Sequence, residues 1–106
     1  MRIIKMLAEG ISENIEEARE KIEEAYRLKS LHPAESMWLR EMALAHLNFN
    51  ARGHELVAAQ IAAYKASQEY KDHPEYADGM MAVWNDKHAD MMARSARVKA
   101  MIDGLK

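Results

Sequence analysis

Residues 33–68 read PAESMWLREMALAHLNFNARGHELVAAQIAAYKASQ, a stretch with one glycine and no proline after its first position. Pro33 suits the first position of a helix, where its missing N–H group would have no partner in any case. Apolar side chains recur every three or four residues on more than one face. The pattern predicts one long helix, about 54 Å at 1.5 Å per residue, with neighbours on several sides.

The stretches on either side predict two further helices. Residues 2–30 carry apolar side chains three or four apart, and Gly10 marks one place where this helix could break. A second His-Pro pair, His73-Pro74, begins a helix that runs to about Asp103 and stops at Gly104. Because the connections are short, consecutive helices should be antiparallel.

The fold class follows from the composition of the whole chain. Its 106 residues include four glycines, two prolines and no cysteine, and 49% are hydrophobic. Few turn residues argue against a sheet, and a chain without cysteine has no disulfides, thiolate metal sites or cysteine nucleophiles. At about 100–200 residues per domain, residues 1–106 form one all-α domain. We predict a long up-down-up three-helix bundle completed by dimerisation, because three helices leave part of the apolar central helix uncovered.

Charge and hydropathy exclude two classes of partner. Seventeen acidic and 15 basic side chains give a net charge of −2, and the basic residues of 94–99 have no interleaved aromatics, so nucleic-acid binding is not expected. The apolar runs are too short to span a membrane. The N-terminal MRIIKMLAEG has too short an apolar stretch for a signal peptide. The sequence therefore predicts a cytoplasmic protein.

Histidines interrupt the apolar stripes of the second and third long helices. Histidine beside carboxylate suits iron, manganese or zinc in a helical bundle. Counting residues from each turn places His54 level with His88 and with residues near 9. The predicted metal ligands are Glu9, Glu13, His54 and His88. A second option is His46 with Glu16 or Glu17. Histidines that are packed and hydrogen-bonded to neighbours would give the same pattern, so both interpretations stay open.

Two short runs resemble a known family. MALAHLNFNARGH at residues 42–54 and WNDKH at residues 84–88 are similar to small ferritin-like proteins of bacteria and phages, which are rubrerythrin-type bundles of reduced size. The resemblance implies a ferritin-like bundle and a bound metal. The Glu-x-x-His pair of ferritin-like sites is absent from both runs, so ferroxidase chemistry is not part of what the resemblance implies.

Large apolar side chains point to association between copies of the chain. Aromatic and methionine side chains at helical spacing are expected in the core or at an interface. These residues are Trp38, Met42, Phe49, Trp84 and Met91. With no complete catalytic motif present, the sequence predicts a non-catalytic scaffold that forms homo-oligomers, and a ferritin-like metal-binding protein is the alternative.

Overall fold

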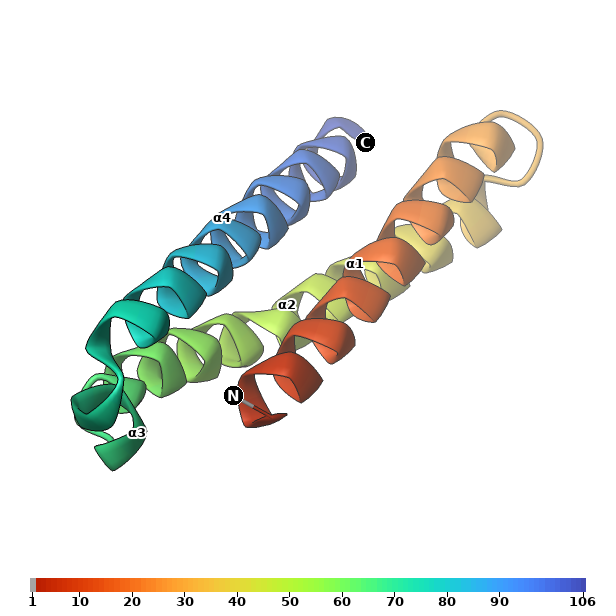
Figure 1. The fold of residues 1–106 in the computed structure, drawn as a ribbon. Coiled ribbons are helices and arrows are strands. Elements are labelled where there is room, and N and C mark those ends of the chain that lie inside the picture. Colours follow the sequence, from red (N-terminus) through yellow and green to blue (C-terminus); the bar gives the residue numbers. More distant parts are fainter. Residues whose placement is uncertain (1) are drawn as a thin grey trace.

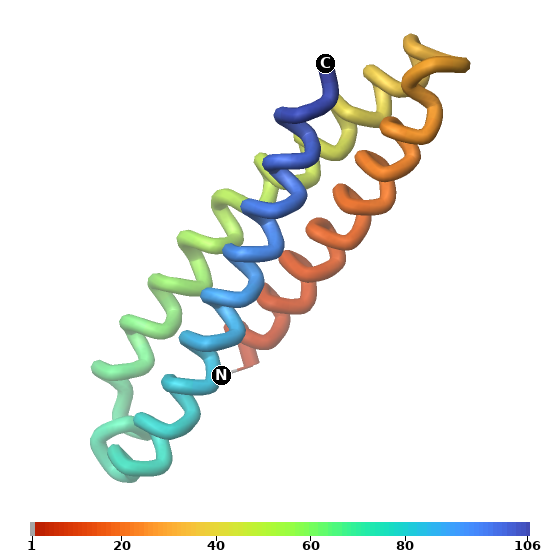
Figure 2. The backbone as a smooth tube through the Cα atoms, turned by 90° about the horizontal axis from the view of Figure 1, so that it is seen from above, coloured from red at the N-terminus to blue at the C-terminus, as the bar shows by residue number. Residues whose placement is uncertain are grey.

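Three long helices and one short helix make up the computed structural model, which describes residues 2–106. They are α1 (Arg2–Leu28), α2 (Pro33–Tyr64), α3 (Gln68–Asp72) and α4 (Pro74–Gly104). Figure 1 shows α1, α2 and α4 running in alternate directions, with α3 in the turn between α2 and α4. Seen from above in Figure 2, the three long helices lie side by side in a rod of 60 × 16 × 16 Å.

The prediction of an all-α protein is confirmed, and the predicted number of helices is corrected from three to four. The second helix ends at Tyr64 rather than near Gln68, because Ser67 starts a new helix. The Ser67 hydroxyl accepts a hydrogen bond from the Tyr70 N–H at 3.2 Å and donates one to the Tyr64 carbonyl at 2.6 Å. The first helix passes through Gly10 without a break.

Both His-Pro pairs begin helices at the predicted residues. Pro33 is the first residue of α2 and Pro74 is the first residue of α4. The carbonyl of the preceding histidine accepts the first helical hydrogen bond in each case, from Ser36 at 3.0 Å and from Ala77 at 2.9 Å. The histidine side chains make no capping bond. His32 and His73 therefore belong to the turns.

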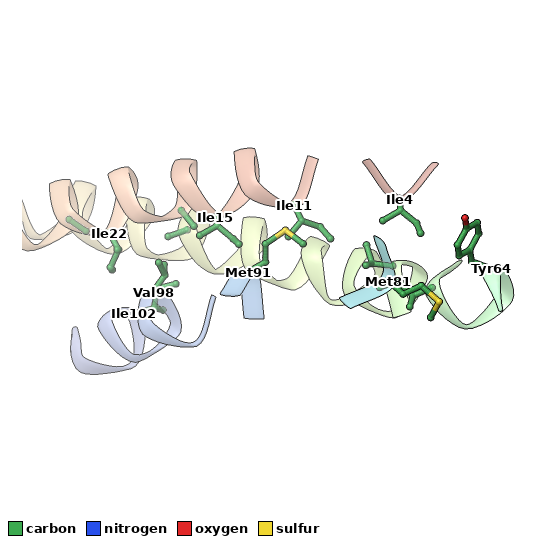
Figure 3. Close-up of a cluster of buried hydrophobic side chains, with 14 of the residues drawn as sticks. Ile4, Ile11, Ile15, Ile22, Tyr64, Met81, Met91, Val98 and Ile102 are labelled. Carbon is green, nitrogen blue, oxygen red and sulfur yellow. The ribbon is translucent and has the colours of Figure 1, made fainter. Parts of the chain in front are cut away.

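The core is built from residues seven apart on each long helix. Buried residues at this spacing are Ile4, Ile11, Ala18 and Ala25 of α1, Ser36, Ala43, Asn50, Val57 and Tyr64 of α2, and Met91 and Val98 of α4 with Leu105 just after its end. A second set four residues further on includes Ile15, Ile22, Ile61, Met81 and Ile102. Figure 3 shows hydrophobic members of this core between the helices, among them Ile11, Ile22, Met91 and Ile102. A spacing of seven with an intermediate residue is the pattern of coiled-coil packing.

Several α2 residues that face α1 are small or polar. The buried Ser36 hydroxyl donates to the Ala25 carbonyl at 2.6 Å, and the Asn50 amide donates to the Ile11 carbonyl at 3.0 Å. At Gly53, an added Cβ would lie 3.0 Å from Cγ1 of Ile11. The glycine therefore permits this close approach of the two helices.

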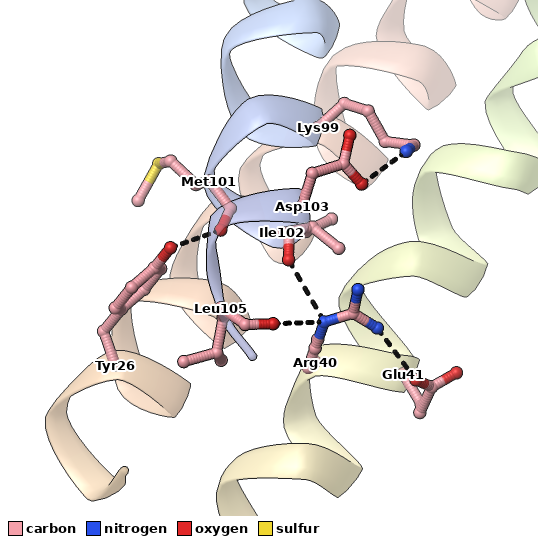
Figure 4. Close-up of polar contacts among 8 residues, drawn as sticks. All are labelled: Tyr26, Arg40, Glu41, Lys99, Met101, Ile102, Asp103 and Leu105. Atoms are coloured by element: carbon pink, nitrogen blue, oxygen red, sulfur yellow. Dashed lines mark hydrogen bonds and ion pairs between the residues drawn. The ribbon is translucent and has the colours of Figure 1, made fainter.

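Residues from both other helices satisfy the carboxyl end of α4, where the last carbonyls of a helix lack partners within it. The Tyr26 hydroxyl of α1 donates to the Met101 carbonyl at 2.6 Å. Nε of Arg40 on α2 donates to the carbonyls of Ile102 and Leu105, at 3.1 and 3.0 Å. Figure 4 shows the two side chains meeting this end of α4. They fix its position along the rod.

Candidate functional site

Two histidines and a serine form a polar cluster between α2 and α4. His54 Nδ1 lies 3.3 Å from His88 Nε2, and His54 Nε2 lies 3.3 Å from the Ser95 hydroxyl oxygen. The two imidazole centroids are 5.3 Å apart, and the rings are tilted by 31°. His88 and Ser95 occupy the α4 positions between Met81 and Ile102 at the same spacing of seven, so the cluster replaces apolar layers of the core.

Two arrangements of protons satisfy both contacts of this cluster. The Ser95 oxygen can accept from His54 Nε2–H while His54 Nδ1 accepts from His88 Nε2–H, or the Ser95 hydroxyl can donate to His54 Nε2 while His54 Nδ1–H donates to His88 Nε2. Both arrangements are compatible with neutral rings. Burial lowers the pKa of His54, and the charge of His88 lowers it further; burial also lowers the pKa of His88. Two charged rings would place N–H groups face to face, so the cluster favours neutral histidines.

Acid should therefore destabilise the protein in the range where free histidine titrates. The unfolded chain takes up protons near its histidine pKa of about 6.5, before the folded chain does. The histidine contribution is thus fully present above about pH 6.5 and is lost as the pH falls toward the lowered folded values. We expect the free energy of unfolding, measured by urea titration with EDTA at fixed protein concentration, to fall between about pH 7.5 and 5.5.

The matched variants for this experiment are His88→Gln and His32→Gln. Glutamine does not titrate, so the His88→Gln variant keeps only His54 of the pair. Its free energy of unfolding should therefore depend less steeply on pH than that of the wild type. His32 lies exposed in the turn before α2, so His32→Gln should keep the wild-type dependence. Equal slopes in all three proteins would contradict the role given to the cluster.

The two predicted carboxylate ligands lie apart from the histidine pair. Glu9 and Glu13 are both exposed on α1, because Ile11 and Ile15 take the inward positions of that part of the helix. Within residues 2–106, no three histidine, aspartate or glutamate side chains form a group that could hold a metal ion. The structure thus brings together His54 and His88 but not the glutamates, and the metal site stays a prediction.

Glu9 instead lines a groove between α1 and α4. The groove has a volume of about 560 Å³, with Trp84 and Met91 on its apolar part and Lys5 and Lys87 among its charged residues. Nζ of Lys87 lies 5.0 Å from the centroid of the Trp84 ring, within range of a cation–π interaction. Three acidic and three basic side chains line the groove, so its net charge favours neither anions nor cations.

The second predicted pair, His46 with a glutamate of α1, is partly formed. His46 Nε2 lies 3.2 Å from Oε2 of Glu17, and Nδ1 lies 2.9 Å from the Asn14 side-chain oxygen. Glu16 is not involved, since its carboxylate pairs with Arg19. The Arg19 hydrogen bond lowers the pKa of Glu16. His46 therefore ties α2 to α1.

Sequence reasoning did not identify Ser95 and Asn14 as the partners of these histidines. Ser95 lies seven residues after His88, on the same face of α4, and this spacing is the signal that points to it. Asn14 has no such signal, because it lies beside the row of buried isoleucines rather than within it. Its contact with His46 depends on how α1 is rotated about its axis.

The large apolar residues divide between the core and the surface. Met91 is buried, and Trp84 is half-buried against the core. Trp38 and Phe49 are exposed on α2, with 63% and 75% of their surface accessible, and Met42 is half-buried. Trp38 and Phe49 are thus outside the core of the protomer.

These exposed residues belong to an apolar face of α2, here called the α2 stripe. Its members are Trp38, Met42, Ala45, Phe49, Leu56, Ala59 and Ala63. With Arg52 included, the positions alternate between four and three residues apart, as in a coiled-coil seam. A hollow of about 380 Å³ lies along it, lined by Met42, Ala45 and Phe49 together with Asn14 and His46. No helix of residues 2–106 covers Trp38 or Phe49.

No family model, curated protein or solved structure matches the chain. These comparisons therefore neither support nor contradict the resemblance to ferritin-like proteins. Of the helices formed by residues 2–106, none is long and apolar enough to cross a membrane.

Proposed function

We propose that the protein is a non-catalytic helical scaffold that associates with itself through the α2 stripe. The observation that carries this proposal is the exposure of Trp38 and Phe49 on a face with coiled-coil spacing. Each square ångström of apolar surface removed from water contributes about 25 cal/mol, and large aromatics contribute most. Contiguous exposed apolar surface of this kind is typical of an interface.

The shape of the protomer also supports association. Its accessible surface is 6825 Å², whereas a compact monomer of 12.1 kDa is expected to expose about 6,000 Å². The excess arises because a rod of 60 × 16 × 16 Å has little interior for its length. Packing a second rod along α2 would reduce this exposed surface.

The interior polar side chains support a structural rather than a chemical role. Ser36 and Asn50 donate to α1 carbonyls, and His54 and His46 each contact neighbouring side chains through both ring nitrogens. Buried polar groups paired in this way hold helices in one register. These contacts support a structural role for His46 and His54.

Light scattering after size-exclusion chromatography tests the proposal. We expect a mass near twice 12.1 kDa at micromolar concentration, because a closed two-fold dimer covers the stripe with the fewest copies. The method measures mass independently of the elongated shape. A mass of 12.1 kDa at the highest attainable concentration would rule out self-association as the function.

A further inference from the structure

The α2 stripe is bulky at one end and small at the other. Trp38 and Met42 lie in its amino-terminal part, and Ala59 and Ala63 lie in its carboxyl-terminal part. Close-packed interfaces place large side chains against small ones, so that the two surfaces interdigitate. Neither end of the stripe is complementary to itself, but each end is complementary to the other.

From this asymmetry we propose that two copies pack their α2 helices antiparallel along the stripe. The two-fold axis crosses the stripe at a level along α2 midway between residues 50 and 51. This inference rests on the proposed self-association and specifies its geometry. Position 38 is as far from that axis as position 63, and 42 is as far as 59. Trp38 then faces the partner's Ala63, and Met42 faces the partner's Ala59.

The inner positions follow the same pairing. Position 45 is as far from the axis as 56, and 49 is as far as 52, so Ala45 meets the partner's Leu56. Antiparallel coiled coils form layers from positions that lie alternately three and four residues apart, which is the spacing of the stripe. Every layer of this register therefore combines a larger with a smaller apolar residue, except the layer that contains Arg52.

The charge of Arg52 also favours the antiparallel direction. Its side chain is exposed, and its guanidinium lies 3.0 Å from Oε2 of Glu55. In the antiparallel register Arg52 lies over the partner's Phe49, which permits a cation–π contact. In a parallel register Arg52 would meet the partner's Arg52, and Ala63 would meet the partner's Ala63. That arrangement combines like charges with poorly filled layers.

Disulfide trapping tests this register, because the chain has no cysteine of its own. We expect an equimolar mixture of Ala45→Cys and Leu56→Cys, incubated to exchange subunits and then oxidised, to give a cross-linked dimer on a non-reducing gel. Each variant alone should give none. Two copies of position 45 would lie about 16 Å apart along the axis, beyond the reach of a disulfide.

Ala96→Cys is the control, because this position is exposed on α4 away from the stripe. Its mixture with Leu56→Cys should remain uncross-linked. Cross-linking of Ala45→Cys with itself would indicate a parallel pair and overturn the inference. A dimer mass without cross-linking of the main mixture would overturn the register but leave the scaffold function standing, whereas a monomer mass would overturn both.

Discussion

Replacing Ile22 by alanine should lower the free energy of unfolding by about 2–5 kcal/mol. Ile22 is 0% exposed and is among the largest fully buried side chains of the rod. Its truncation removes apolar contacts and leaves a cavity that the neighbouring helices fill only in part. Small domains have total stabilities of about 5–15 kcal/mol, so the variant should unfold at a much lower urea concentration than the wild type. Circular dichroism at fixed protein concentration measures this unfolding.

Two milder variants separate this effect from a general loss of apolar surface. Ile22→Val removes one methyl group at the same buried position and should cost about 0.5–1.5 kcal/mol. Val83→Ala removes apolar atoms from a residue that is 52% exposed on α4 and should change the stability by less than about 0.5 kcal/mol. If all three substitutions had similar effects, Ile22 would not be a core residue.

Placing glutamate at both Trp38 and Phe49 should convert the dimer into a monomer of 12.1 kDa. The double variant removes two aromatic anchors and, at position 38, would bury a charge against the partner's Ala63, which weakens association by at least about a hundredfold. Both side chains are exposed in the protomer, so the helical content should stay unchanged. Light scattering and circular dichroism measure the two quantities.

The matched control is Val83→Glu with Met92→Glu. Both residues are 52% exposed, both lie on α4, and the pair adds the same charge as the test variant. This control should keep the dimer mass. Loss of the dimer in both double variants would point to charge repulsion, and retention in both would place the interface elsewhere on the rod.

Helix starts were predictable because they depend on local chemistry. Pro33 and Pro74 begin helices through their fixed backbone angle and missing N–H group, which need no tertiary contact. The end of α2 was harder to predict, because residues 65–68 contain no glycine or proline to stop a helix. Ser67 supplies the signal there as the cap of α3, and its effect competes with continuation of the long helix.

The face of α2 that turns inward was harder to predict than the helix itself. Three stripes of α2 are apolar, and the structure buries the one that carries Ser36, Ala43 and Asn50. Small side chains allow two helix axes to approach closely, whereas Trp38 and Phe49 on the remaining stripe would hold α1 away. Hydrophobicity alone therefore indicates that α2 has neighbours but not which residues face them.

The sequence predicted the level of the histidine pair along the rod, but not the rotation of α1 about its own axis. Counting from the turns placed His54 level with His88, and the structure has the two rings in contact. The same count cannot show which side of α1 faces the pair. Burial of Ile11 and Ile15 decides that rotation and turns Glu9 and Glu13 toward solvent.

The capping of α4 by Tyr26 and Arg40 also has a consequence for the order of assembly during synthesis. A ribosome makes the chain from its amino terminus, and structure can form as segments emerge. Tyr26 and Arg40 lie on either side of the connection between α1 and α2, so both are made before the last turn of α4. The hairpin of α1 and α2 can thus present Tyr26 and Arg40 as fixed partners for the end of α4 once that segment has been made.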